Sequence, residues 1–330
     1  MDKKELVKID NISKLFQVDS GMWSKSKDYV HAVSDVSLSI YEGETLGLVG
    51  ESGCGKSTLG RLIINLIEPT EGKVYFDGID IHKLSSEELR DLRKDMQIIF
   101  QDPYASLNPR WTIRDIIAEP LETHHKKMSK KETTERVQEL MRFTGIRPEH
   151  LDRYPHQFSG GQRQRVGIAR ALALNPKFIV CDEPVSALDV SIQSQILNLL
   201  GDIQKKMGIS YLFISHDLSV VRYLSDRVCV MFLGKICELG TTSLVYEDPI
   251  HPYTKFLLEA IPKPDPTKRK SEKQMLLGEI PSPVNPPSGC RFHTRCPYKI
   301  EICSKVEPEL LECRGRMVAC HRAQELIGKL

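Results

Sequence analysis

The eight residues at 50–57 read G-E-S-G-C-G-K-S and constrain the fold more than any other stretch of this chain. An apolar run at 45–49 comes before them and predicts a buried strand, and apolar residues at helical spacing follow at 58–66. A strand, a glycine-rich loop and a helix in this order predict a phosphate-binding loop, whose main-chain N–H groups and helix N-terminus attract an anion. Lys56 can then reach the β- and γ-phosphates, and the Ser57 hydroxyl can bind Mg²⁺. The expected nucleotide-binding residues of this loop are Gly50, Ser52, Gly53, Cys54, Gly55, Lys56, Ser57 and Thr58.

Composition and charge argue against a nucleic-acid-binding protein, a membrane-spanning protein and a secreted protein. The chain has 330 residues and a formal net charge of +2, which gives no reason to expect a nucleic acid. No apolar run reaches the ~18–20 residues that span a bilayer. The N-terminal residues have no apolar segment of the kind found in signal peptides. We therefore expect a cytoplasmic protein.

Apolar runs alternate with segments of helical spacing over most of the chain. Strands that alternate with helices predict an α/β fold with a largely parallel sheet covered on both faces. From about residue 104 to 165 the spacing is helical, which predicts a helical subdomain inserted into the core. After about residue 248 a series of prolines predicts irregular chain. The runs that predict strands beyond the phosphate loop are 96–100, 178–181, 211–214, 228–233 and 235–239.

Two carboxylates follow the apolar run at 178–181. The carboxyl end of a strand lies beside the phosphate loop in folds of this topology. Asp182 is therefore expected to hold Mg²⁺ through water, and Glu183 to polarise an attacking water molecule. A simple capped strand end is the alternative for either residue taken alone.

Further motifs make the chain similar to the ATP-binding-cassette (ABC) ATPases. The sequence F-S-G-G-Q at 158–162 resembles the signature motif of that family, which begins with Leu where this chain has Phe158. The first part of the chain, 1–245, has the family's motifs in the family's order. The remaining matches are the Q-loop Gln101, the D-loop at 186–189 ending in Asp189, the switch His216 and the adenine-stacking aromatic Phe16.

The resemblance implies a P-loop NTPase fold: an ABC nucleotide-binding domain with a parallel-sheet core, an antiparallel β subdomain and an inserted helical subdomain. It also implies a head-to-tail dimer in which the signature residues Ser159, Gly160, Gly161 and Gln162 of one subunit contact ATP held by the other. Glu183 and His216 would serve hydrolysis together with Gln101. The implied Mg²⁺ ligands are Ser57, Gln101 and Asp182.

Further stretches narrow the likeness to the oligopeptide/dipeptide permease ATPases, and the match extends to about residue 322. Two of them lie before the C-terminal region, at 51–54 (ESGC) and 100–110 (FQDPYASLNPR), and three lie within the C-terminal region at 246–330, namely His251-Pro252-Tyr253, Pro281-Ser282-Pro283 and 290–297 (CRFHTRCP). The chain is most similar to the second ATPase subunit of that family. The resemblance implies a sister ATPase, two transmembrane permease subunits and an extracytoplasmic peptide-binding protein, with the ATPase on the cytoplasmic face of the membrane. Import of nickel, glutathione or oligosaccharides is the alternative cargo, and a soluble ABC ATPase that does not transport is a more distant one.

The C-terminal region is rich in cysteine, with five of the chain's nine cysteines in its last 41 residues. In a reducing compartment such a cluster favours a metal over disulfides. The C-x₂-C pairs typical of structural zinc are absent. The family resemblance implies a [4Fe–4S] cluster, with zinc, or free thiols or disulfides, as alternatives. The implied cluster ligands are Cys290, Cys296, Cys303 and Cys320, and Cys313 is left out.

Overall fold

The computed structural model describes residues 4–18, 28–125, 127–261 and 279–328. The chain divides into two compact units. We call the first the helical unit; it comprises Met1–Leu6, Ile40–Thr45 and Phe76–Ser215. We call the second the loop unit, because it carries the phosphate-binding loop; it comprises Val7–Ser39, Leu46–Tyr75 and His216–Leu330.

The helical unit contains three neighbouring parallel strands, β6 (Met96–Ile99), β7 (Phe178–Asp182) and β8 (Ser210–Ile214). In their register, Ile179 lies opposite Gln97 on one side and Tyr211 on the other. Every residue of β7 and β8 is buried. Strands buried on both faces read as continuous apolar runs, so the predicted parallel sheet is confirmed.

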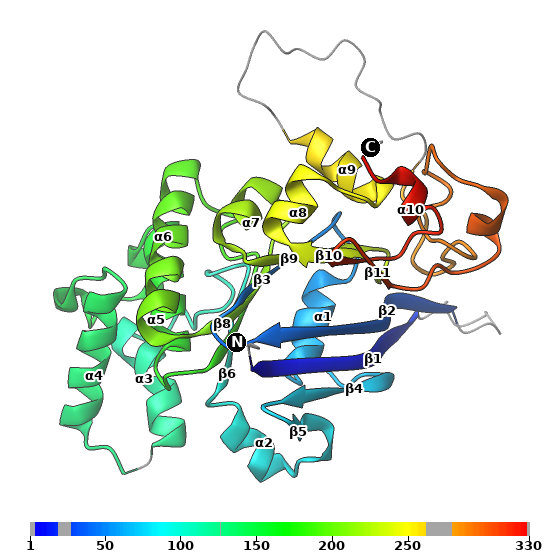
Figure 1. Ribbon diagram of the computed structural model, residues 1–330. Coiled ribbons are helices and arrows are strands. Elements are labelled where there is room, and N and C mark those ends of the chain that lie inside the picture. The colour runs from blue at the N-terminus through cyan, green and yellow to red at the C-terminus, as the bar shows by residue number, and fades with distance from the viewer. Residues whose placement is uncertain (1–3, 19–27, 126, 262–278, 329–330) are drawn as a thin grey trace, which may run out of the picture. The chain divides into compact units, whose positions relative to one another are not determined.

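The predicted helical stretch at about 104–165 contains α3 (Ile113–His124) and α4 (Lys130–Phe143), and α5 (Gly160–Ala171) begins in it and continues past its predicted end. These three helices pack against one another (Figure 1). Each of these helices begins with a capping box, in which a cap side chain and an N3 side chain bond each other's main-chain N–H. The cap pairs are Thr112 with Asp115, Ser129 with Glu132 and Ser159 with Gln162. The other elements of this unit are β5 (Ile79–Asp80), α2 (Ser86–Leu92) and α6 (Val190–Met207).

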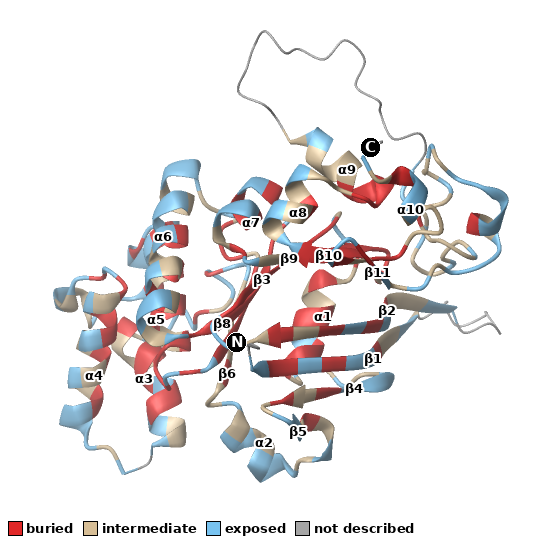
Figure 2. Cartoon of the chain, in the orientation of Figure 1, coloured by how far each residue is buried: buried red, intermediate tan, exposed pale blue. Residues whose placement is uncertain are grey.

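The loop unit is built on β3 (Thr45–Val49), which pairs in parallel with β9 (Arg227–Phe232). The predicted strands at 228–233 and 235–239 form a hairpin, in which β9 pairs with β10 (Lys235–Thr241) in antiparallel orientation. Two short strands of the C-terminal region continue this sheet: β12 (Arg316–Val318) pairs with β10, and β11 (Leu311–Cys313) pairs with β12. Figure 2 shows β9 and β10 almost entirely buried.

The C-terminal region is more regular than its prolines predict. It contains the helix α9 (Pro252–Ala260) and the hairpin β11–β12 where we expected irregular chain. The proline-rich residues 262–278 lie outside the described part of the chain. The remaining elements are β1 (Glu5–Val18), β2 (Asp28–Tyr41), β4 (Glu71–Phe76), α1 (Lys56–Ile63), α7 (Leu218–Leu224), α8 (Thr242–Glu247), α9 (Pro252–Ala260) and α10 (Ala323–Leu326). Among the described residues, no helix has both the length and the apolar character that a membrane crossing requires.

Candidate functional site

The phosphate-binding loop joins β3 to α1 and follows the predicted strand–loop–helix order. Gly55 caps α1 with φ 102°, and Gly50 has φ 154°. A Cβ at Gly50 would overlap the carbonyl oxygen of Met231, and one at Gly55 would overlap that of Ala32. These glycines are thus required by the chain's own packing as well as by their backbone angles. Sequence reasoning missed Met231 and Ala32, because a main-chain carbonyl leaves no mark on the side-chain pattern.

Lys56 lies inside the loop and is 4% exposed. Its Nζ donates hydrogen bonds to the carbonyl oxygens of Gly50 at 2.8 Å and Glu51 at 3.0 Å. The loop is also tied to the β9–β10 turn, because Gly234 N donates to the Cys54 carbonyl at 2.9 Å. Burial raises the pKa of the Cys54 thiol, so this side chain stays uncharged within the loop. The loop thus encloses one buried ammonium group, which is hydrogen-bonded to two of the loop's own carbonyl oxygens.

In the helical unit, Gln101 and Glu183 come together although they are far apart in sequence. Gln101 Nε2 donates a hydrogen bond to Glu183 Oε2 at 2.9 Å. Glu183 has φ 46°, an uncommon conformation for a residue other than glycine, and its N–H donates to the Ile214 carbonyl. Asp182, the preceding residue, ends β7 and is 2% exposed. The end of β7 thus presents a buried carboxylate next to one that is oriented by an amide.

The start of α5 is exposed at Ser159 and Gly160. Gln162 Oε1 accepts a hydrogen bond from Ser159 N, and Gln162 N donates to Ser159 Oγ. Gly161 is buried, and a Cβ there would overlap the side chain of Ile192 on α6. The glycine therefore lets the two helices approach. Because Ser159 and Gly160 are exposed, the N-terminus of α5 faces solvent, which is an arrangement suited to binding an anion.

The other predicted residues occupy defined places. Asp189 caps α6, where it accepts hydrogen bonds from Ile192 N at 3.0 Å and Ser191 Oγ at 2.7 Å. These bonds hold the pKa of Asp189 below its usual value. His216 is exposed between β8 and α7, and Phe16 on β1 is 39% exposed. The predicted site residues thus fall into two sets. Phe16, the phosphate loop and His216 belong to the loop unit, and Gln101, Asp182, Glu183, the signature residues and Asp189 belong to the helical unit.

The expected [4Fe–4S] cluster is wrong. The four implied cysteines do line one small cavity of about 20 Å³. However, no three or more His, Cys, Asp or Glu side chains in the described part of the chain are grouped so that they could hold a metal ion, which also removes the zinc alternative. Burial raises the pKa of Cys290 to about 12 and that of Cys320 to about 11. All nine cysteines are free, and Cys313 packs against Ile250 and Val318 as a small apolar side chain.

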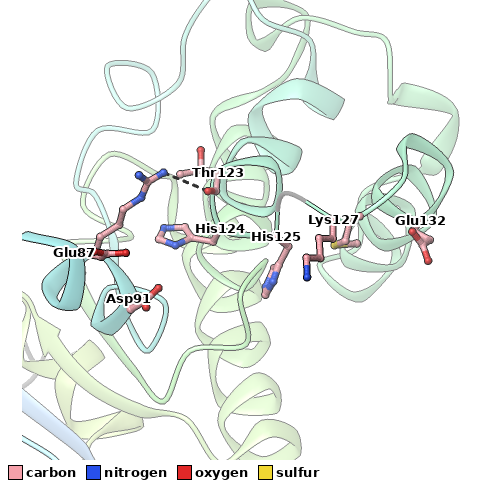
Figure 3. Close-up of a pocket in the computed structure, with 9 residues that line it drawn as sticks. Glu87, Asp91, Thr123, His124, His125, Lys127 and Glu132 are labelled. Carbon is pink, nitrogen blue, oxygen red and sulfur yellow. Dashed lines mark hydrogen bonds between the residues drawn. The ribbon is translucent and has the colours of Figure 1, made fainter.

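A pocket of about 590 Å³ lies in the helical unit between α2 and the segment that joins α3 to α4. Figure 3 shows Glu87 and Asp91 on α2, with His124 extending toward them from the end of α3. Arg90 donates a hydrogen bond to the Thr123 carbonyl at 3.3 Å across this pocket. Burial and the nearby Lys94 and Arg90 lower the pKa of His124, so its imidazole is neutral at pH 7. The pocket is lined by charged and polar side chains.

Comparison with known proteins relates both parts of the chain to one class of transporter. Residues 33–186 match the family model described as ABC transporter, and residues 237–303 match the oligopeptide/dipeptide transporter C-terminal region. The chain is 52% identical to the oligopeptide transport ATP-binding protein OppF of Salmonella typhimurium, with 98% of each chain covered. It is 52% identical to AppF of Bacillus subtilis, over 97% of this chain and 98% of the other. It is 49% identical to the di/tripeptide transport ATP-binding protein DppF of Pseudomonas aeruginosa, over 96% and 98%.

Solved structures show the same fold. The ATP-binding cassette MJ0796, in a dimeric post-hydrolysis state bound to ADP and Pi, superposes with a TM-score of 0.64 at 33% identity. That match covers 72% of this chain and 99% of the other. CbiO1 of Clostridium perfringens, part of the ABC transporter complex cbiONQ, gives a TM-score of 0.63 at 29% identity, over 74% and 91% of the two chains. The predicted ABC fold is confirmed. The chain belongs to the ABC transporter family, among the ATP-binding proteins of oligopeptide and dipeptide transporters.

Proposed function

We propose that this chain is the ATP-hydrolysing subunit that drives import of dipeptides and oligopeptides across the cytoplasmic membrane. The observation that carries the hydrolytic part is the 2.9 Å hydrogen bond from Gln101 to Glu183 at the end of β7. The C-terminal match at 237–303 and the peptide-transport relatives support the cargo. The chain acts at the cytoplasmic face of the membrane, bound to permease subunits.

The residues closest to the chemistry have the following roles in this proposal. Lys56 neutralises phosphate charge, and Glu183 takes a proton from the attacking water while Gln101 fixes the orientation of its carboxylate. His216 steadies the γ-phosphate, and Phe16 stacks on adenine. We assign Mg²⁺ binding to Ser57, Gln101 and Asp182, whose hydroxyl, amide and carboxylate oxygens are ligands of the kind that this ion takes; when bound, it would neutralise phosphate charge.

The exposed N-terminus of α5 is the reason to propose a shared site. Lys56 already provides one phosphate-binding end of a helix, and Ser159 and Gly160 open a second, outward-facing one. One ATP molecule does not need both from the same subunit. In a head-to-tail pair, Ser159 of one subunit contacts the γ-phosphate on Lys56 of the other. We take the partner to be a non-identical sister ATPase.

The permease contact runs through the Q-loop and the helical subdomain. Gln101 touches Glu183 directly, so movement of the Q-loop alters the group that polarises water. The pocket between α2 and the α3–α4 segment belongs to the same unit and is the surface we assign to a cytoplasmic segment of the permease. An extracytoplasmic binding protein delivers the peptide and does not touch this chain.

Reconstitution tests this function. The chain would be co-purified with its sister ATPase and permease subunits, placed in proteoliposomes, and supplied with MgATP and each candidate binding protein. We expect uptake of a labelled tripeptide that stops when this chain is omitted. Uptake of nickel, glutathione or an oligosaccharide instead would overturn the cargo. ATP hydrolysis that does not respond to the permease would overturn the transport role.

A further inference from the structure

Two side chains of the C-terminal region contact the phosphate-binding loop at a single residue, Glu51. Tyr253 Oη accepts a hydrogen bond from Glu51 N at 2.9 Å. Arg295 Nη1 donates to Glu51 Oε2 at 2.9 Å. The Arg295 side chain is 7% exposed and the Glu51 side chain 21%, so this ion pair is largely removed from water. All three residues belong to the loop unit.

Both contacting side chains are held rigidly. The Tyr253 ring is fully buried, with its centroid 4.8 Å from that of Phe232 and 5.3 Å from that of Phe292. The Phe232 and Phe292 rings meet edge to face at 5.4 Å. The guanidinium of Arg295 lies 5.9 Å from the Phe232 centroid, within the range of a cation–π contact. Little side-chain freedom therefore remains to be lost when these groups hold the loop.

The start of α9 is itself fixed by a buried ion pair. The Glu238 carboxylate on β10 accepts hydrogen bonds from Ile250 N at 3.1 Å and His251 N at 3.0 Å. His251 Nδ1 then accepts from Tyr253 N at 3.0 Å, which caps α9. Arg316 on β12 pairs with Glu238 at 3.4 Å. The C-terminal hairpin thus fixes the helix that carries Tyr253.

The charge of Glu51 makes these contacts matter for nucleotide binding. A carboxylate in the phosphate-binding loop repels the triphosphate, and the repulsion is strong where water is excluded. We propose that Arg295 and Tyr253 are positioning residues for ATP: Arg295 neutralises the Glu51 carboxylate, and Tyr253 fixes the Glu51 main-chain N–H. The C-terminal region then supports nucleotide binding by the phosphate-binding loop. This inference rests on the proposed ATPase function.

The test is a double-mutant cycle on Glu51 and Arg295 in the full-length chain. Binding of the non-hydrolysable analogue AMPPNP with Mg²⁺ would be measured by calorimetry for the wild type, Glu51→Gln, Arg295→Met and the double variant. Arg295→Met should weaken binding about tenfold, because it leaves the loop carboxylate without its counter-charge. The double variant should return to within about threefold of Glu51→Gln, because no carboxylate remains to be neutralised. Tyr253→Phe, which removes only the hydroxyl, should weaken binding severalfold with only a small fall in the unfolding midpoint, because the packing of the ring is kept.

Lys305→Met is the matched control. It removes a positive charge from the same region, where the Lys305–Glu301 pair is exposed to solvent, and it should leave binding unchanged. Wild-type affinity in Arg295→Met would overturn the inference. So would weak binding that the double variant does not restore, because Arg295 would then only hold the fold. Failure of the wild-type chain to bind the analogue would instead overturn the ATPase function, so the two failures are distinct.

Discussion

Replacing Arg316 with Met should destabilise the C-terminal part of the loop unit strongly. The side chains of Arg316 and Glu238 are 1% and 0% exposed, and the substitution leaves the Glu238 carboxylate buried without its partner. Removing one member of a buried ion pair costs about 3–5 kcal/mol of unfolding free energy. The same substitution also leaves the Leu244 and Asp248 carbonyls without the hydrogen bonds that Arg316 donates.

The loss of unfolding free energy in Arg316→Met should grow as the pH rises. Burial raises the pKa of Glu238, so the folded state takes up a proton at a higher pH than the unfolded state does. The penalty for the buried carboxylate is therefore absent below the unfolded pKa and complete above the folded pKa. In Arg316→Met we expect the destabilisation to be greatest at neutral pH. It should shrink as the pH falls and Glu238 becomes protonated.

Urea unfolding followed by circular dichroism, together with hydrogen exchange over residues 244–254, would measure this effect. Lys305→Met serves as the control, because exposed pairs contribute about 0–1 kcal/mol. The double variant Glu238→Gln/Arg316→Met should recover roughly 2 kcal/mol or more, since it has no buried charge. A loss in Arg316→Met no larger than that of the control would refute the reasoning, and so would a loss that does not change with pH.

Three substitutions probe other parts of the site. Ser159→Arg should spare AMPPNP binding by the isolated chain, because Lys56 is untouched, but should abolish ATP-dependent dimerisation in light scattering; loss of binding itself would show that both phosphate-binding ends act within one subunit. Gly161→Ala should destabilise the packing of α5 on α6 by about 1–3 kcal/mol in urea, because its Cβ would overlap Ile192, and an unchanged stability would contradict the close approach. Gly55→Ala should abolish nucleotide binding, because its Cβ would overlap the Ala32 carbonyl at φ 102°; calorimetry showing normal affinity would contradict this.

Much of the fold could be predicted from local sequence patterns. The apolar runs before Gly50 and Asp182 predicted the strands β3 and β7. Both strands are buried on both faces, so they appear in the sequence as continuous apolar runs. The start of α5 carries the signature residues 159–162, and the structure adds that Ser159 and Gln162 form a capping box there. These features follow from interactions that are short in sequence.

What depends on distant contacts could not be predicted in this way. The contact between Gln101 and Glu183 joins residues 82 positions apart, and the pattern of neither segment encodes it. Tyr253 was noticed as part of a family motif, but nothing in its neighbourhood pointed to Glu51, 202 positions away. The C-terminal cysteines led to a wrong prediction. Five cysteines within 41 residues of a chain expected to be cytoplasmic favoured a metal, but in the structure all five are free thiols, and Cys303 and Cys313 are buried as small apolar side chains.

Single-turnover hydrolysis by Glu183→Gln tests the central claim most directly. The variant should be assembled with its sister ATPase and permease subunits, and its MgATP binding and rate of phosphate release should both be measured. Because a positioned base contributes roughly 10²–10⁴-fold, we expect binding like that of the wild type and hydrolysis at least ~100-fold slower. Near-normal phosphate release would contradict the account, because the carboxylate that Gln101 orients would then have no part in catalysis.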